Sequence, residues 1–189
     1  MDYSLVRDDI NNGDVLAFGY VRTSIFSQLI SLVTRSRISH VGIAIRFYGR
    51  LCVIEALEGH GVRVFPISTL LREGRKIWWY QLRFPHSKLR RFELCEFALR
   101  HWGKRYASPW QFVRTFSLVT RRICDLLKIK RDTNEDRFFC SEFVVSALKH
   151  AGVEIEVDAA SMSPADVIEL PCLLQRGILE WTTDLRQPS

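Results

Sequence analysis

The amino-acid sequence predicts an α+β domain in which an antiparallel sheet carries helices packed on one side. Two observations lead to this prediction. Along the chain a strand-like run and a helical run are followed by several short strand-like runs and then by helical runs, so like elements are grouped. The chain has 189 residues, of which 47% are hydrophobic, enough for one sizeable core, and we see no repeat or Pro/Gly/Ser linker. We therefore expect residues 1–189 to form a single domain.

The strands are predicted in the first half of the chain. Apolar or alternating runs bounded by turn residues occur at 15–21, 40–45, 51–57, 61–67 and 76–84. The middle three follow one another closely, which favours an antiparallel meander with its first turn at Tyr48 and Gly49. Residues 24–36 interrupt the series with apolar positions at helical spacing, which predicts an amphipathic helix.

The second half of the chain is predicted to be mainly helical. One helix runs from Lys88 to Trp102 and ends at Gly103, and a second ends at Gly152. The sequence SPADVIELP then predicts a short helix that stops at a proline. Between the two long helices, residues 108–131 form a basic, amphipathic insert.

The net charge and the absence of long apolar runs restrict the class of protein. The chain has 27 Lys and Arg against 21 Asp and Glu, a net charge of +6, which is compatible with an anionic membrane surface or an acidic polymer. It contains no nucleic-acid-binding motif, so we do not expect it to bind nucleic acid. No secretory signal and no stretch of about 18 apolar residues is visible. We expect a chain that is cytoplasmic as synthesised and that needs a partner for delivery elsewhere.

The cysteines argue against a disulfide framework and against a metal site. The five are odd in number, include no C-x-x-C pair and have no His at metal-ligand spacing. They are Cys52, Cys95, Cys124, Cys140 and Cys172. We therefore expect free thiols, as in a reducing compartment, and neither a metal nor another cofactor.

Cys140 is the candidate nucleophile. It lies at or just before the first turn of the helix that ends at Gly152, where the positive end of the helix dipole favours a thiolate. The free backbone N–H groups of that turn could hold an oxyanion. A small buried structural cysteine fits the same position, so position alone does not decide the role.

His40 and Glu55 are the candidate partners of this thiol. If Tyr48 and Gly49 are the two loop residues of a hairpin, Glu55 lies opposite Gly42. His40 and Glu55 are then diagonal neighbours on one face, within reach of each other. The small residues on that face, Gly42 and Ala44, leave room for a helix end to approach. The arrangement predicts a nucleophile, a base and a residue that orients the base.

Seven segments carry a resemblance to a known family. They are GDVLAF, SHVGIAI, VIEAL, GVRVFPI, GKRYA, FFCSEFVVSALKHAG and SPADVIEL, and they cover the chain from Gly13 to about Leu170. In this order they resemble the YiiX-like branch of the NlpC-type papain-fold enzymes, which is distantly related to lecithin retinol acyltransferase. Because the histidine precedes the cysteine, the resemblance is to the circularly permuted form.

The resemblance implies a circularly permuted papain-like fold and a role for each site residue. Cys140 would be the nucleophile, His40 the general base and Glu55 the orienting residue. Tyr106, in GKRYA, matches a tyrosine near the nucleophile in these relatives, and Tyr106 and Ser141 are candidate contacts to the oxyanion or the substrate. A glutamine at position 55 would keep an acceptor for the imidazole N–H, so we expect it to be milder than loss of Cys140 or His40.

The expected function is hydrolysis of an amide bond, in a peptide or a cell-wall (peptidoglycan) peptide, through an acyl-enzyme. Two alternatives stay open. The insert at 108–131 interleaves aromatic and basic residues as interfacial helices do, which would suit hydrolysis or transfer of a lipid acyl group, from an amide or an ester, at an anionic membrane surface. The chain could also be a non-catalytic structural component of an assembly. The sequence gives no oligomeric state.

Overall fold

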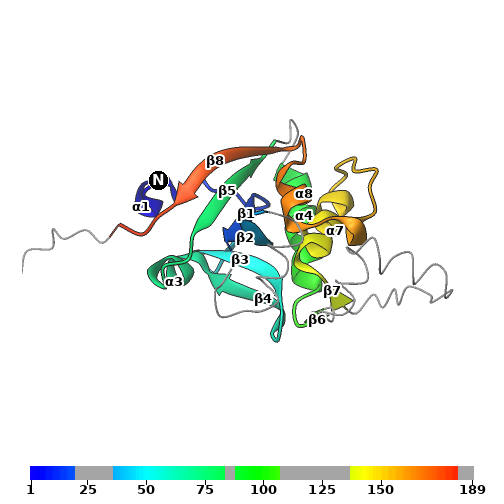
Figure 1. Cartoon of the computed structure of the whole chain (residues 1–189), viewed down its shortest axis with the longest axis horizontal. Helices are drawn as coiled ribbons and strands as arrows, with labels where there is room; N and C mark the ends of the chain where they lie inside the picture. Colours follow the sequence, from blue (N-terminus) through cyan, green and yellow to red (C-terminus); the bar gives the residue numbers. More distant parts are fainter. Residues whose placement is uncertain (20–35, 84–87, 107–136, 183–189) are drawn as a thin grey trace, which may run out of the picture.

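The computed structural model of the chain describes residues 1–19, 36–83, 88–106 and 137–182. Almost all of the helix predicted at 24–36, and the whole of the insert predicted at 108–131, lie outside these residues. The described residues form an α+β structure built on an antiparallel sheet, as the sequence predicted, and this sheet has six strands (Figure 1).

The strands lie in the order β4-β3-β2-β1-β5-β8, and each pairs antiparallel with its neighbours. Their bounds are Val15–Gly19 for β1, Ile38–Phe47 for β2, Arg50–Leu57 for β3, Gly61–Pro66 for β4, Ile77–Leu82 for β5 and Leu173–Leu179 for β8. Strand β2 is buried along eight of its ten residues, because the sheet is covered on both faces. The strand order and the antiparallel pairing confirm the predicted meander, whose three runs are β2, β3 and β4.

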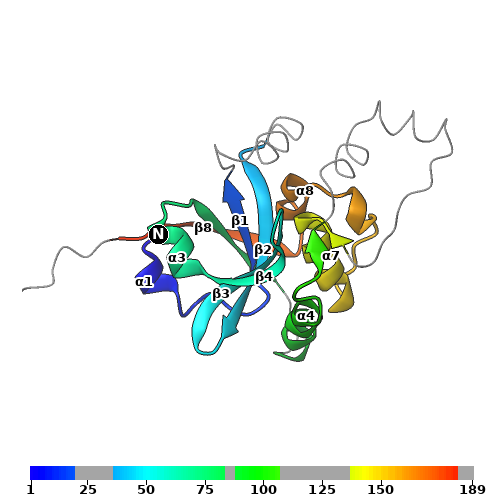
Figure 2. The ribbon, with the colours of Figure 1, turned by 90° about the horizontal axis from the view of Figure 1, so that it is seen from below.

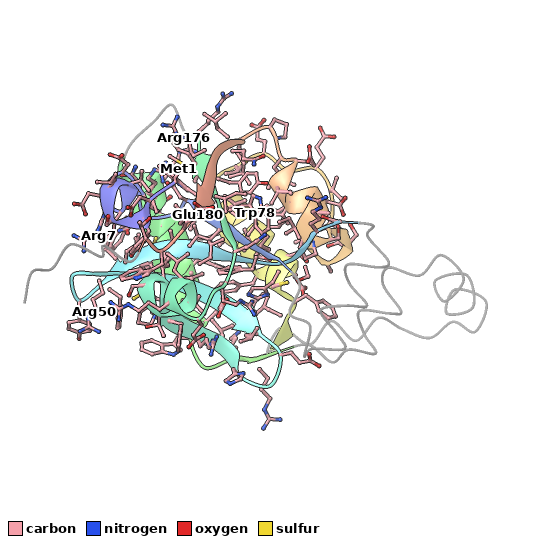
Figure 3. The ribbon with its side chains drawn as sticks, turned by 60° about the vertical axis from the view of Figure 1, so that its left-hand side comes forward. Met1, Arg7, Arg50, Trp78, Arg176 and Glu180 are labelled. Atoms are coloured by element: carbon pink, nitrogen blue, oxygen red, sulfur yellow. The ribbon has the colours of Figure 1, made fainter. Side chains whose placement is uncertain are left out.

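The turn between β2 and β3 sets the register of the site. Tyr48 and Gly49 both have positive φ, 46° and 75°, as a two-residue hairpin loop with the twist of its strands requires. Arg50 follows this turn at the outer end of the hairpin (Figure 3). Ile43 pairs with Ile54, and the pairing continues outward to Phe47 and Arg50, so the register predicted from the sequence is confirmed.

Three helices cover one face of the sheet. They are α4 (Lys88–Arg100), α7 (Cys140–His150) and α8 (Pro164–Ile168), and they lie together on one side in Figures 1 and 2. Their buried residues join Val41, Ile43 and Ile45 of β2 in one hydrophobic core. Two short helices, α1 (Tyr3–Val6) and α3 (Ile67–Arg72), cover the opposite face and complete a second core with Leu16 and Phe18. The prediction that helices pack on one side of the sheet therefore holds for α4, α7 and α8 but not for these two.

Several short elements were not predicted. Strand β8 pairs with β5 at one edge of the sheet, and the chain start lies against its end, with the Met1 ammonium donating to the Ile178 carbonyl at 2.6 Å (Figure 3). The run predicted as strand to residue 67 ends at Pro66, and α3 begins there. The two-residue strands β6 (Arg105–Tyr106) and β7 (Arg137–Phe138) pair in parallel, and a 3-10 helix, η1 (Ala159–Ser161), follows α7.

The buried carboxylate of Asp14 ties three elements together. It has no exposed surface, and it accepts hydrogen bonds from Trp79 Nε1 at 2.9 Å and the Leu82 N–H at 3.1 Å, both in β5. Arg91 of α4 donates to it at 2.8 Å. Because a buried charge is stable only when paired and hydrogen-bonded, this network fixes α4 against the start of β1 and the end of β5.

Among the described helices, none is long and apolar enough to cross a membrane.

Candidate active site

Cys140 is the first residue of α7. The chain arrives through β7, Phe139 is still extended, and the helix then begins. The N–H of Phe139 donates to Glu142 Oε2 at 3.2 Å, which helps to fix the first turn. Behind Cys140, the apolar side of α7 is buried against the sheet, including Phe143 and Val144 with no exposed surface. The thiol is therefore held by a rigid helix at the end where backbone N–H groups are free of helical partners.

His40 is the third residue of β2, and its side chain shares a face with Phe18 of the neighbouring strand β1. The two residues pair across the strands, and their ring centroids are 5.4 Å apart. The side chain of His40 is only 10% exposed. Its position is therefore determined by a central strand and an aromatic neighbour and not by a surface loop.

Glu55 of β3 lies beside His40, as the register predicted. Its Oε2 is 2.7 Å from His40 Nε2, and the carboxylate is 3% exposed. Its other oxygen, Oε1, accepts two hydrogen bonds from Arg63 of β4, from Nε at 3.0 Å and from Nη2 at 2.9 Å. Glu55 and Arg63 are directly opposite each other in the β3–β4 pair. Arg63 was not among the predicted site residues, although extending the predicted meander by one turn places it across from Glu55.

The electrostatics of the cluster favour a charged carboxylate. Burial is the largest single influence on Glu55 and by itself raises the pKa of the carboxyl. The opposing charges and hydrogen bonds of His40 and Arg63 outweigh burial and leave the pKa of Glu55 below its ordinary value. Glu55 is thus an anion at neutral pH although it has almost no contact with solvent.

His40 is influenced from two sides. Burial is again the largest single influence and lowers the pKa of the imidazole, while the charge of Cys140 and then that of Glu55, each with a side-chain hydrogen bond, raise it. The raising influences prevail, and the pKa of His40 rises to about 10. The imidazole thus interacts with a sulfur on one side and a carboxylate on the other. A thiol, an imidazole and an orienting carboxylate in this order can carry out nucleophilic attack on a carbonyl group.

The other described thiols have different surroundings. Burial raises the pKa of Cys95 to about 11, and it also raises the pKa of Cys52 and Cys172. All four described cysteines are free, and Cys124 lies outside the described residues. Among the four, Cys140 is the one that interacts with a histidine.

The two further candidate contacts lie close to Cys140 in the chain or the fold. Ser141 is the next residue of α7 and is buried. The backbone of Tyr106 pairs with Phe138, two residues before Cys140, while the side chain of Tyr106 is outside what the structure describes. Their roles stay predictions.

Gly42 has a different role from the one predicted for it. The space beside Gly42 and Ala44 was expected to admit the end of the cysteine helix. The body of α7 packs instead on the opposite face, in the same core as Val41 and Ile43, while its first residue, Cys140, interacts with His40. A Cβ atom on Gly42 would lie 2.5 Å from Val53 Cγ2 and 3.1 Å from Glu55 Cβ. The small residue therefore makes room for strand β3, not for a helix.

A metal site is not evident in the described part of the chain. Nowhere among these residues do three or more His, Cys, Asp or Glu side chains gather in a group that could hold a metal ion.

Comparisons with known proteins agree with this architecture. A family model described as a permuted papain-like amidase enzyme, YaeF/YiiX, of the C92 family matches residues 9–167. The crystal structure of the metalloprotein YiiX from Escherichia coli O157:H7 is similar, with a TM-score of 0.62 and 20% sequence identity over 91% of this chain and 98% of that chain. No curated protein matches the sequence.

Proposed function

Because this chain belongs to the YaeF/YiiX family of permuted papain-like amidases, and is thus a cysteine hydrolase that acts on amides, we propose that its substrate is a peptide or cell-wall peptide and that Cys140, His40 and Glu55 cleave it. The observation that supports the proposal best is the place of His40, which interacts with the Cys140 sulfur and lies 2.7 Å from the Glu55 carboxylate. The first partner supplies a nucleophile, and the second orients the base.

In the first step the Cys140 thiolate attacks the carbonyl carbon of the amide. The carbonyl oxygen becomes an oxyanion, for which the free N–H groups at the start of α7 are available donors. The imidazolium of His40 then gives its proton to the leaving nitrogen, the C–N bond breaks, and an acyl-enzyme thioester and a free amine result.

In the second step His40, now neutral, takes a proton from a water molecule, which attacks the thioester. The carboxylic acid product leaves, and the thiolate and imidazolium are restored. Because Nε2 of His40 faces Glu55, Nδ1 is the nitrogen that would exchange protons with the sulfur and the leaving group. Glu55 would hold the ring in the tautomer this exchange requires.

The alternatives have less support. Lipid acyl hydrolysis or transfer at an anionic membrane surface was predicted from residues 108–131, which lie outside the described residues, so it stays a prediction. A purely structural role does not fit membership in a family of cysteine peptidases and amidases.

The test is to trap the acyl group and locate it. Fluorogenic amides of short peptides and matched esters are incubated with the protein, and the acyl-enzyme is captured by rapid acid quench and mapped by mass spectrometry. We expect the acyl group on Cys140 and no turnover by Cys140→Ala, whereas Cys52→Ala, a buried thiol without a histidine partner, behaves as wild type. An acyl group on another cysteine, or equal turnover by Cys140→Ala, would refute the assignment.

A further inference from the structure

The two carboxylate oxygens of Glu55 have different partners. Oε2 faces His40 Nε2, and Oε1 accepts both hydrogen bonds from the Arg63 guanidinium. The three side chains come from the adjacent strands β2, β3 and β4, so the backbone ladder fixes their spacing. Neither oxygen is free to exchange its partner without breaking a charged hydrogen bond.

We propose that Arg63 is a positioning residue that determines which end of the residue 55 side chain faces His40. The consequence of this role for catalysis rests on the function proposed above. The structural part of the proposal, control of the proton on the imidazole, can be measured without any substrate.

The surroundings of Arg63 favour this role. Its guanidinium presents two parallel N–H groups to one oxygen, which a lysine ammonium cannot reproduce in the same geometry. The guanidinium carbon also lies 4.6 Å from the centre of the Phe65 ring, and the side chain is 24% exposed. The arginine is thus held by an aromatic ring on one side while it holds Glu55 on the other.

The charged groups around His40 are few in the described residues. Cys140 of α7 and Glu55 of β3 act on the imidazole, and Arg63 of β4 acts on Glu55. Arg75, which follows α3, also interacts with Glu55 through its charge. Of the two arginines, Arg63 is the one that is hydrogen-bonded to Glu55, so it can select an orientation and not only add charge.

The effect of Arg63 becomes visible when Glu55 is replaced by Gln. A side-chain amide has one acceptor oxygen and one NH₂ donor, and Arg63 can only donate. Arg63 would therefore take the oxygen and leave the NH₂ group facing His40 Nε2. The imidazole would have to accept there, its proton would move to Nδ1, and the nitrogen turned toward Cys140 could no longer take up a proton. The loss of kcat should then approach the roughly 10⁴-fold known for a wrong tautomer in a serine protease.

The first experiment reads the tautomer directly. In the Cys140→Ala background, ¹⁵N chemical shifts of the neutral His40 ring show which nitrogen carries the proton. We expect the proton on Nε2 with Glu55 present, on Nδ1 in Glu55→Gln, and again on Nε2 in Glu55→Gln with Arg63→Met, because the amide can then turn its oxygen to the ring. If the proton remains on Nε2 in Glu55→Gln, the proposal is overturned. This outcome can be read without the variant that also carries Arg63→Met.

The second experiment is kinetic and uses chains with Cys140 intact. Adding Arg63→Met to Glu55→Gln should raise the activity of that variant at least tenfold. On its own, Arg63→Met should lower the activity of the wild type. Arg63→Lys should restore less activity, because the lysine ammonium can still donate a hydrogen bond to the amide oxygen. Arg91→Met is the matched control, since Arg91 forms a comparable pair with Asp14 away from the site, and it should restore nothing.

The outcomes separate the two proposals. A tautomer switch without amide hydrolysis by the wild type would leave the role of Arg63 intact and refute the proposed function. Amide hydrolysis that depends on Cys140, with no rescue by Arg63→Met, would leave the function intact and overturn the role of Arg63. The signals of His60, His101 and His150 should not change in any variant, which shows that an altered His40 signal is local.

Discussion

The backbone of Gly42 lies directly against the side chain of Glu55: a Cβ atom on Gly42 would be 3.1 Å from Glu55 Cβ and 2.5 Å from Val53 Cγ2. Neither neighbour can withdraw easily, because Val53 is β-branched and fully buried and Glu55 is held by His40 and Arg63. The missing side chain at position 42 is therefore part of how the carboxylate reaches the imidazole.

We expect Gly42→Ala to lower both stability and activity. Overpacking in a core costs about 1–3 kcal/mol, and here the displaced atoms include those that position Glu55. Denaturant unfolding gives the loss of stability, and kcat on an amide gives the loss of function. Gly19→Ala, on the adjacent strand, is the control, because its nearest atom would be the Trp78 ring at 3.4 Å. If both variants retain wild-type kcat, Gly42 has no part in positioning Glu55.

The pKa of His40 gives a second prediction, because its opposing causes can be removed one at a time. The charge of Cys140 and that of Glu55 raise it to about 10, whereas burial lowers it. Cys140→Ala and Glu55→Gln should each lower the pKa of His40. In the variant that combines them burial prevails, and the pKa should fall below the ordinary 6.5.

The measurement is a titration of the His40 ring signals by NMR. The wild-type imidazolium should persist through neutral pH and lose its proton near pH 10. A His40 that titrates close to 6.5 in the wild type would show that neither Cys140 nor Glu55 stabilises the imidazolium.

A third prediction concerns Cys140 and His40 as a unit. Cys140→Ala should abolish turnover because no thioester can form, and His40→Ala should be nearly as severe because the leaving nitrogen has no proton donor. The double variant should be little worse than either single one, since residues that act together are strongly non-additive. A double variant whose loss equals the product of the two single losses would mean that the residues act independently.

A fourth prediction concerns stability alone. Asp14→Asn leaves the Arg91 charge without its buried partner, and breaking a buried ion pair from one side costs about 3–5 kcal/mol. Thermal or denaturant unfolding should show this loss, while the His40 tautomer and pKa stay as in the wild type. A shift in the His40 titration would contradict the separation of the Asp14 network from the site.

The effect expected for Glu55→Gln illustrates how the structure changes a prediction. From the sequence, replacing Glu55 by glutamine is expected to cause a mild loss of activity, because the amide oxygen can still accept a hydrogen bond from the imidazole N–H. In the structure, Arg63 donates two hydrogen bonds to one oxygen of Glu55. It would donate in the same way to the side-chain oxygen of a glutamine, which is that amide's only acceptor. The expectation changes from a mild loss to a severe one because of a residue on a third strand.

Local signals in the sequence determined several features. The loop of Tyr48 and Gly49 fixed the hairpin register and with it the contact of His40 with Glu55, because a two-residue turn leaves a single pairing of its strands. The periodicity after Cys140 placed this residue at the start of a helix, because an amphipathic pattern and a terminal glycine are readable within one element. In both cases the residues that decide the structure are neighbours in the chain.

Only the tertiary structure decided how distant elements meet. Strand β8 pairs with β5 nearly a hundred residues earlier, and α7 covers the face of Val41 and Ile43 and not that of Gly42. Either face of β2 is apolar enough to bury, so hydrophobicity alone cannot select one. The division of the Glu55 oxygens between His40 and Arg63 depends on a third strand arriving in register. Such choices depend on packing and hydrogen-bond geometry summed over the whole fold, and no single segment of the sequence contains them.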